Sequence, residues 1–304
     1  MKWRKGGLIY APDGSLPWAK VGAQLPTVEI VSSEIVRVYY LSKDRDGFGR
    51  IGSVDLNARN PSQILKVAQD PVVDLGELGA FDDSGVGPST TVRVGDKRYL
   101  YYQGYQRAGR VPYLTFTGLA VSEGDSTFKK ISRVPITDRT NEEPFIRSTC
   151  AILRQGEVWK MWYVSTLKWT QDANGVHYVC VIRYATSHDG ISWQTDPQIC
   201  LEPNLADEYA VGRPAVIYED GRYKMWYSIR SFREFYVMGY AESDDGVRWE
   251  RKDAAVGIEK SATGWDSEMI CYPFVVDING ERFMFYNGNG RGITGFGYAI
   301  LVAD

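Results

Sequence analysis

Histidine is scarce in this sequence, which restricts the chemistry available to the chain. Only two histidines, His177 and His188, occur in 304 residues. A histidine-based metal site or a Ser-His-Asp triad needs further ligands or partners at suitable spacing, and neither histidine has them. We therefore expect no metal site and no serine-protease type of catalysis.

Paired cysteines, long apolar runs and an excess of basic charge are also absent. The four cysteines show no Cys-x-x-Cys spacing, as expected of buried, reduced thiols; they are Cys150, Cys180, Cys200 and Cys271. No stretch of about 18 apolar residues could span a membrane, and the N-terminus, MKWRKGGLIYAP, lacks the apolar core of a signal peptide. The net charge of -3 argues against nucleic acid as a partner. These absences predict a cytoplasmic protein that binds neither membranes nor nucleic acid.

The chain is rich in aromatic residues and glycine. It has 20 Tyr, 9 Trp and 31 Gly, and 44% of its residues are hydrophobic. Aromatic side chains fit the pleated surface of a sheet, and glycine supplies the positive φ angles of tight turns. This composition favours a globular protein of strands joined by short turns.

A tetrapeptide related to KMWY recurs along the chain. The copies RVYY, YLYY, KMWY, KMWY and FMFY begin at residues 37, 99, 160, 224 and 283, so successive copies are 59 to 64 residues apart. Each copy carries large apolar side chains in the period-2 pattern of a strand, and a regular period of this kind indicates a repeat architecture. We expect these anchor tetrapeptides to be core strands first and binding motifs only secondarily.

A second motif follows the anchors and completes the repeat unit. LAVSEGDSTF, YATSHDGISW and YAESDDGVRW each place a turn between two strand-like segments, as in a β-hairpin. Each repeat then holds four antiparallel strands, which is the composition of a propeller blade. The last repeat lacks its final strand, and residues 2–12, KWRKGGLIYAP, could supply it. The sequence therefore predicts an all-β, single-domain, five-bladed β-propeller over residues 1–304, closed by the N-terminal strand.

Carboxylates recur at one phase of the repeat. Four of them lie 15 to 17 residues before the anchors that begin at residues 99, 160, 224 and 283; they are Asp83, Glu143, Glu208 and Glu268. Equal positions in successive blades converge on one central pocket, where like charges raise carboxylate pKa values and suit acid-base chemistry. We expect these four residues to be catalytic, with solvent-facing loop acids as the alternative.

Other polar residues near the same phase are candidates for substrate binding. They are Gln24, Asp82, Arg147, Arg213, Asp266 and Arg291. The arginines have two open interpretations, because a guanidinium either pairs with a nearby carboxylate or binds an anionic group of a ligand.

With these motifs, chiefly EDGRYKMWYS and YAESDDGVRW, nearly the whole chain resembles the five-bladed propeller glycosidases. These include the arabinanase and xylosidase group, the invertase and levansucrase group, and the related mannoside phosphorylases. The resemblance implies a carbohydrate substrate in a central pocket and no cofactor. It also implies that Asp82 or Asp83 corresponds to the second-blade aspartate and Glu143 to the proton donor.

The first repeat departs from that resemblance. Its matching stretch, VGAQLPTVE, has Gln24 where the family has an aspartate. Three alternatives follow for the function. The first is hydrolysis, with Glu143 as acid and Glu208 or Glu268 as base or nucleophile; the second is phosphorolysis or glycosyl transfer with an arginine-bound phosphate or nucleotide sugar. The third is a non-catalytic glycan-binding propeller.

Overall fold

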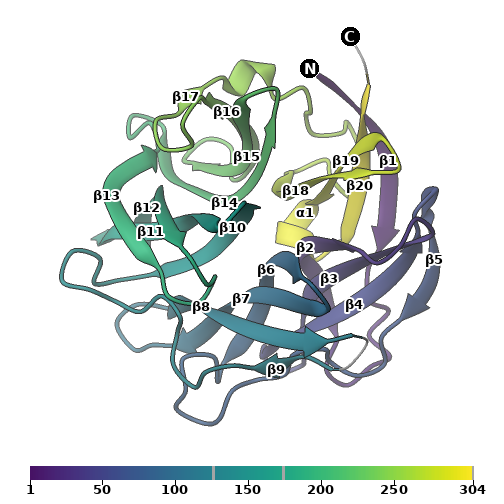
Figure 1. Ribbon diagram of the computed structural model, residues 1–304, viewed down its shortest axis with the longest axis horizontal. Helices are drawn as coiled ribbons and strands as arrows, with labels where there is room; N and C mark the ends of the chain where they lie inside the picture. The colour runs from purple at the N-terminus through teal and green to yellow at the C-terminus, as the bar shows by residue number, and fades with distance from the viewer. Residues whose placement is uncertain (125–126, 173–174, 303–304) are drawn as a thin grey trace.

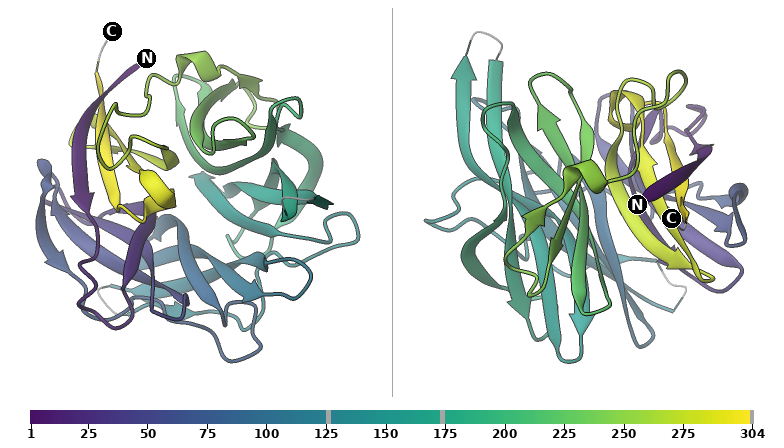
Figure 2. Two further views of the ribbon diagram at one scale, coloured as in Figure 1. Left: turned by 180° about the vertical axis from the view of Figure 1, so that it is seen from behind. Right: turned by 90° about the horizontal axis from the view of Figure 1, so that it is seen from above.

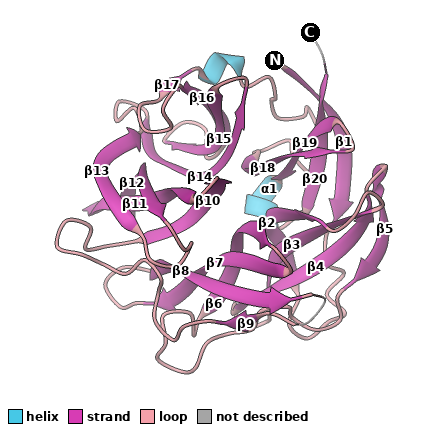
Figure 3. Cartoon of the chain, in the orientation of Figure 1, coloured by secondary structure: helices cyan, strands magenta, loops and turns pink. Residues whose placement is uncertain are grey.

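Strands make up nearly all of the regular structure (Figures 1 and 3). The computed structural model describes residues 1–124, 127–172 and 175–302. These residues contain strands β1 to β20, a 3-10 turn η1 (Asp253–Ala255) and a short helix α1 (Asn289–Gly292). Neither helical segment of the described chain has the length and apolar character needed to cross a membrane. The protein is all-β.

Antiparallel groups of four strands follow one another along the chain. In each group, every strand after the first pairs with the strand before it in the sequence. The groups are β2 (Val21–Ile30), β3 (Ile35–Lys43), β4 (Gly49–Asn57) and β5 (Asn60–Val67); β6 (Gly85–Val94), β7 (Lys97–Arg107), β8 (Tyr113–Glu123) and β9 (Lys129–Lys130); β10 (Arg147–Gln155), β11 (Val158–Asp172), β12 (Gly175–Ser187) and β13 (Gln194–Leu201); and β14 (Glu208–Glu219), β15 (Arg222–Ser231), β16 (Val237–Ser243) and β17 (Glu250–Arg251).

The remaining group joins the two ends of the chain. It consists of β18 (Cys271–Ile278), β19 (Glu281–Asn287), β20 (Phe296–Val302) and the N-terminal strand β1 (Lys2–Tyr10). Strand β1 pairs antiparallel with β20, with Trp3 opposite Leu301. Figures 1 and 2 both show the N-terminal strand alongside the last strand of the chain. The N-terminal segment is therefore the outer strand of a group whose other strands come from the C-terminal end.

Turn chemistry explains why the first two strands of a group form hairpins. Asp220 and Gly221 link β14 to β15 with φ angles of 50° and 78°, and Asn279 and Gly280 link β18 to β19 with φ angles of 51° and 87°. Asp-Gly and Asn-Gly tolerate two successive positive φ angles, as the two-residue turns that match the twist of paired strands require. These turns hold the register in which each anchor tetrapeptide forms the second strand of its group.

The anchor tetrapeptides form the core between neighbouring groups. Among the fully buried large side chains are Trp162 and Trp226, the tryptophans of the two KMWY copies. Trp162 packs 5.6 Å from the ring of Tyr223 in the following group, and Trp226 packs 5.9 Å from Trp3 on β1. The repeated tetrapeptide therefore provides aromatic packing between one group and the next.

The first strand of each group lies nearest the middle of the molecule (Figure 1). These inner strands are β2, β6, β10, β14 and β18. Single parallel bridges link neighbouring groups near this centre, for example Gly49 with Gly85 and Cys180 with Ala210. Side chains at equal positions on the inner strands therefore come close together in space.

Candidate functional site

Every inner strand has an irregularity in its register where it passes the centre. The pairing shifts within β2, β6, β10, β14 and β18. In four of these strands a non-glycine residue at the shift has a positive φ angle; the residues are Leu25 (60°), Thr149 (48°), Arg213 (53°) and Tyr272 (57°). Such a conformation costs about 1–3 kcal/mol per residue and is concentrated at functional sites, while a bulge re-aims side chains. The repeated bulge marks the centre as the candidate site.

A cavity of about 130 Å³ lies at these bulges. Its walls carry tyrosines, hydroxyl groups, amides and two arginines. The polar lining residues are Gln24, Gln103, Tyr105, Tyr113, Thr115, Ser148, Thr149, Tyr178, Arg213, Ser228, Arg230, Tyr236 and Tyr272. None of the described residues that line the cavity is an aspartate or a glutamate. The cavity is therefore aromatic and cationic rather than acidic.

Arg213 is one of the two lining arginines and joins three inner strands. Its side chain extends from β14 and donates hydrogen bonds to the carbonyls of Ser89 (2.7 Å) and Pro26 (3.1 Å) and to Oγ1 of Thr27 (2.7 Å). Arg213 is 2% exposed and, within the described chain, forms no ion pair with a carboxylate. Burial lowers its pKa to about 10, so the guanidinium still carries its charge at neutral pH.

Arg230, on β15, lies in a cage of aromatic rings. Its guanidinium carbon is 5.0 Å from the ring centroids of Tyr178 and Tyr236, 5.1 Å from Tyr209 and 5.4 Å from Phe235. Arg230 also donates a hydrogen bond to the hydroxyl of Tyr178, and its Nε has no hydrogen-bond partner among the described residues. Cation–π contacts orient the guanidinium without neutralising its charge. The charge of Arg230 therefore remains available to an anion in the cavity.

Further cations gather beside Arg230. Arg291, in the short helix α1 between β19 and β20, lies 5.8 Å from the same Phe235 ring that contacts Arg230. Burial lowers the pKa of Lys43, and the positive charges of Arg291 and Arg107 lower it further. In the described part of the chain, no salt bridge to a carboxylate involves any of these cations. Arg291, which shares the Phe235 ring with Arg230, and Lys43 near it thus add positive charge that no salt bridge within the described residues balances.

Hydroxyl groups and amides line the rest of the wall. Burial raises the pKa of Tyr105, Tyr113 and Tyr272, so these phenols are protonated at neutral pH. Gln103 donates from Nε2 to the Tyr105 hydroxyl (2.6 Å) and accepts at Oε1 from Thr149 Oγ1 (2.5 Å). Such fixed donors and acceptors suit the hydroxyl groups of a sugar.

The predicted carboxylates lie elsewhere, and a tyrosine 20 residues later in the chain holds three of them. The last tyrosine of an anchor donates a hydrogen bond to a carboxylate 20 residues earlier in three groups; the pairs are Tyr102 with Asp82 (2.9 Å), Tyr163 with Glu143 (2.8 Å) and Tyr286 with Asp266 (2.8 Å). A cation completes each contact: Lys130 with Asp82, Arg147 with Glu143, and Lys5 with Asp266. Asp82, Arg147 and Asp266, expected to bind substrate, thus lie in these buried ion pairs and outside the cavity lining.

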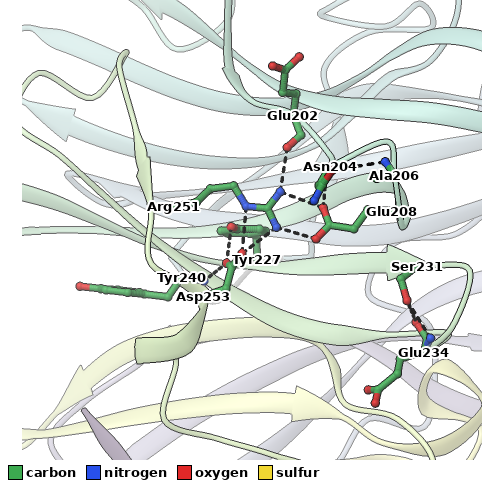
Figure 4. Close-up of polar contacts among 10 residues, drawn as sticks. All are labelled: Glu202, Asn204, Ala206, Glu208, Tyr227, Ser231, Glu234, Tyr240, Arg251 and Asp253. Atoms are coloured by element: carbon green, nitrogen blue, oxygen red, sulfur yellow. Dashed lines mark hydrogen bonds and ion pairs between the residues drawn. The ribbon is translucent and has the colours of Figure 1, made fainter.

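Glu208 belongs to a separate network that Figure 4 draws. Its two carboxylate oxygens accept hydrogen bonds of 2.8 Å from Arg251, which also binds Asp253 at 2.7 Å. Asp253 in turn accepts a hydrogen bond of 2.6 Å from Tyr227, the last tyrosine of the fourth anchor. This group therefore has the same tyrosine, carboxylate and cation contact, with Asp253 in place of a residue 20 positions earlier.

The other two predicted catalytic residues have surface contacts. Asp83 accepts hydrogen bonds from the backbone of Gly79 (2.9 Å) and from Ser84 (2.7 Å), and Glu268 is exposed. The structure does not bring Asp83, Glu143, Glu208 and Glu268 together around the cavity. Of the ten predicted site residues, Gln24 and Arg213 line the cavity and Arg291 lies beside it.

Sequence reasoning missed Arg230 and the tyrosines around it. The sequence contains a regular spacing that indicates this side of the cavity. Three residues each lie six positions after the start of their anchor tetrapeptides; they are Lys43, Tyr105 and Arg230. Among the described residues, no group of three or more His, Cys, Asp or Glu side chains is arranged to hold a metal ion.

Comparisons with known proteins give sequence relatives and the fold. No protein-family model matches the chain. Two proteins of Mycobacterium tuberculosis, the uncharacterized proteins MT1551 and Rv1502, are each 38% identical over 301 residues, which is 99% of both chains. Solved structures with the same fold include a glycoside hydrolase (17% identity, TM-score 0.75, 98% of this chain and 90% of that chain) and a thermostable family-43 glycoside hydrolase (16%, 0.69, 95% and 92%). A structure titled for the GH130 family of mannoside phosphorylases, which contains glycoside hydrolases, also matches (13%, 0.73, 99% and 96%).

Proposed function

Since the chain belongs to the same family as the M. tuberculosis proteins MT1551 and Rv1502, and has the fold of glycoside hydrolases, we propose that it is a carbohydrate-active enzyme that transfers a glycosyl group to or from a phosphate. One observation carries the choice of reaction: the cavity and its surroundings hold arginines and no lining carboxylate. This reaction corresponds to the second alternative predicted from the sequence, which is phosphorolysis or glycosyl transfer with an arginine-bound phosphate or nucleotide sugar.

Hydrolysis by paired carboxylates has little support in this geometry. That reaction needs an acid and a base or nucleophile about 5–10 Å apart on either side of the sugar. The carboxylates expected to do this, Glu143 with Glu208 or Glu268, are held in ion pairs or exposed outside the cavity lining. Their catalytic role stays a prediction, as does that of Asp83.

A phosphate substrate removes the need for a protein carboxylate. When the bond between the anomeric carbon and a phosphate oxygen breaks and a bond to an acceptor hydroxyl forms, the released phosphate accepts the proton of that hydroxyl. The reverse step is phosphorolysis, in which phosphate attacks the anomeric carbon and protonates the leaving oxygen. The protein has to orient the two reactants and stabilise charge on the phosphate, and fixed guanidinium groups do this well.

The residues around the cavity divide these tasks. Arg230 and Arg291 hold the phosphate, because both have unbalanced charge and flank the same ring, Phe235. Gln24 and the buried tyrosine hydroxyls bind sugar hydroxyls. Arg213 fixes the inner strands beneath them and adds positive charge to the floor of the cavity.

The architecture that supports this site is a single five-bladed propeller domain of residues 1–304, in our proposal. Each antiparallel group is one blade, and the pairing of β1 with β20 closes the ring. Closure would remove the free sheet edges that invite aggregation.

Binding and turnover measurements test the function. We expect glycosyl phosphates and inorganic phosphate to raise the thermal midpoint of the protein, and a glycosyl 1-phosphate with an acceptor sugar to release phosphate and form a new glycoside. Arg291→Gln should weaken phosphate-ester binding about tenfold, as expected for loss of a charge-assisted contact, and leave neutral sugars unaffected. The matched control is Arg133→Gln, since Arg133 is exposed and pairs with Glu77 outside the cavity.

Three results would count against this function. Equal binding of neutral and phosphorylated sugars would remove the role of the arginines. Cleavage of neutral glycosides in phosphate-free buffer, lost in Glu143→Gln without loss of stability, would restore hydrolysis through carboxylates. Phosphate-dependent binding with no turnover of any glycosyl phosphate would instead favour the non-catalytic binding propeller.

A further inference from the structure

An aromatic strip with two exposed rings and one half-buried ring lies next to the caged arginine, and the proposed function assigns it no ligand of its own. We define the strip as Tyr209, Phe232 and Phe235. Phe232 is 68% exposed and Phe235 is 47% exposed. Of the described aromatic side chains, only one other, Tyr218, is comparably exposed, although the chain is rich in such residues. Exposed apolar surface concentrated at one place marks a binding site more often than chance.

The strip is continuous with the arginines. The rings of Tyr209 and Phe232 have centroids 5.2 Å apart, and the Arg230 guanidinium lies 5.1 Å from the Tyr209 ring. On the other side, Phe235 contacts both Arg230 (5.4 Å) and Arg291 (5.8 Å). Arg230, which lines the cavity, therefore connects the cavity to the aromatic strip.

Hydrogen bonds fix the shape of the segment that carries the strip. The backbone N–H of Phe232 donates to the carbonyl of Asp207 (2.9 Å). Ser231 Oγ donates to the carbonyl of Glu234 (2.7 Å) and lies 2.8 Å from the Glu234 nitrogen, a contact that Figure 4 draws. The backbone that carries the exposed rings is therefore held in shape before a ligand arrives, which reduces the entropy lost on binding.

The number of cations favours a ligand with more than one negative charge. Arg230 and Arg291 flank one ring, and Lys43 lies close enough to Arg291 for their charges to interact. A single carboxylate needs one guanidinium, whereas a diphosphate offers oxygens to two. Aromatic rings beyond the phosphates suit a flat group, because any nucleobase can stack on them.

We propose that the strip is a nucleobase subsite, so that the ligand is a nucleoside diphosphate sugar with its sugar in the cavity, its diphosphate on Arg230 and Arg291, and its base on Tyr209 and Phe232. The inference rests on the proposed function and narrows it from a phosphate ester to a nucleotide-linked sugar. In the transfer step the bond from the anomeric carbon to the diphosphate oxygen breaks, a bond to an acceptor hydroxyl forms, and the nucleoside diphosphate leaves with the hydroxyl proton.

Isothermal titration calorimetry of the full chain tests this subsite. The probes are uridine, adenosine and guanosine diphosphates, inorganic pyrophosphate and a glycosyl 1-phosphate. We expect at least one nucleoside diphosphate to bind about tenfold more tightly than pyrophosphate, since stacking of a base contributes this much. Phe232→Ala should remove that difference and leave pyrophosphate binding unchanged, and Phe232→Trp should restore it.

Control variants separate the effect of the nucleobase subsite from general effects of a substitution on affinity or stability. Leu78→Ala removes another exposed apolar side chain (100% exposed) far along the sequence and should not change any of the affinities. Thermal unfolding of Phe232→Ala should match that of the unmodified protein because the ring is mostly exposed.

The outcomes distinguish failure of the nucleobase subsite from failure of the proposed phosphate function. If pyrophosphate and the glycosyl 1-phosphate bind but the base adds nothing and Phe232→Ala has no effect, the nucleobase subsite is wrong while the phosphate function stands. If a neutral disaccharide, rather than a nucleoside diphosphate, loses affinity in Phe232→Ala, the strip holds a sugar ring and the inference is overturned. If none of the anions binds, both proposals fail.

Discussion

The hydroxyl of Tyr163 donates a 2.8 Å hydrogen bond to the carboxylate of Glu143, 20 residues earlier in the chain. Both residues are buried, and Arg147 and Arg183 approach the same carboxylate at 3.4 Å and 3.6 Å. The same relation recurs between Tyr102 and Asp82. The carboxylate and its tyrosine partner thus recur together in different strand groups. The first role of the carboxylate is to hold a loop against the second strand of its group.

Tyr163→Phe should therefore reduce stability rather than remove a catalytic group. The change leaves a buried carboxylate with one donor fewer, which costs about 1–3 kcal/mol of unfolding free energy. Urea unfolding of the variant measures this loss, and Tyr218→Phe on the surface serves as the control because Tyr218 is 48% exposed. Unchanged stability together with lost turnover would show that Glu143 and Tyr163 act in the chemistry.

Trp3→Ala should destabilise the protein strongly, although Trp3 is near the end of the chain. Its side chain is 5% exposed and packs at 5.9 Å against Trp226, so β1 contributes core packing to the neighbouring group. Removing a buried tryptophan costs about 3–5 kcal/mol. Thermal and urea unfolding measure the loss, with Lys2→Ala on the same strand as an exposed control. A loss below about 1 kcal/mol would mean that the N-terminal strand is an appendage and not part of the core.

Stability should fall in acid as Glu219 becomes protonated. Glu219 on β14 accepts hydrogen bonds from Arg282 on β19 at 2.7 Å and 2.6 Å, so the pair connects two strand groups. The hydrogen bonds from Arg282 and then from Lys224 lower the pKa of Glu219 from 4.5 to about 2. Because the folded-state pKa is the lower one, the contribution is complete above pH 4.5 and is lost as the pH falls towards 2.

The measurement is the free energy of unfolding as a function of pH. Glu219→Gln should be less stable than the unmodified protein at pH 7, and the difference should shrink between pH 4.5 and pH 2. A difference that stays constant over this range would show that the carboxylate contributes through packing and not through its charge.

The strands and their order could be predicted because their signals are local. Alternating aromatic residues and Asp-Gly turns act over a few residues, so the second strands and hairpins around residues 160–163 and 224–227 follow from the sequence alone. The pairing of β1 with β20 followed from the Trp-led segment at Trp3, which resembles the outer strands of other groups. Local chemistry and the repeat together were enough for the fold class.

The site was harder to predict because side-chain direction depends on distant partners. The spacing of Glu143 and Glu208 is regular, but Tyr163 and Arg251 turn these carboxylates away from the cavity. The bulges that aim Thr149 and Arg213 at the centre depend on φ angles with no sequence signature. Arg230 gains part of its role from the rings of Tyr178 and Tyr209 on other strands, and no spacing within its own segment reveals these two rings.

Arg213 provides a test that separates structural from electrostatic contributions at the centre. Its planar guanidinium reaches acceptors on β2 and β6 at once, through the carbonyls of Ser89 and Pro26 and the hydroxyl of Thr27. Lysine has the charge but lacks the fork that spans these groups. Arg213→Lys should therefore lower the unfolding free energy by about 1–3 kcal/mol, since buried carbonyls lose donors, and should retain part of the affinity for phosphate. Arg213→Met should lose phosphate affinity as well. Urea unfolding and phosphate titration of both variants make the comparison, and an Arg213→Lys protein as stable as the original would show that the contacts across the centre are dispensable.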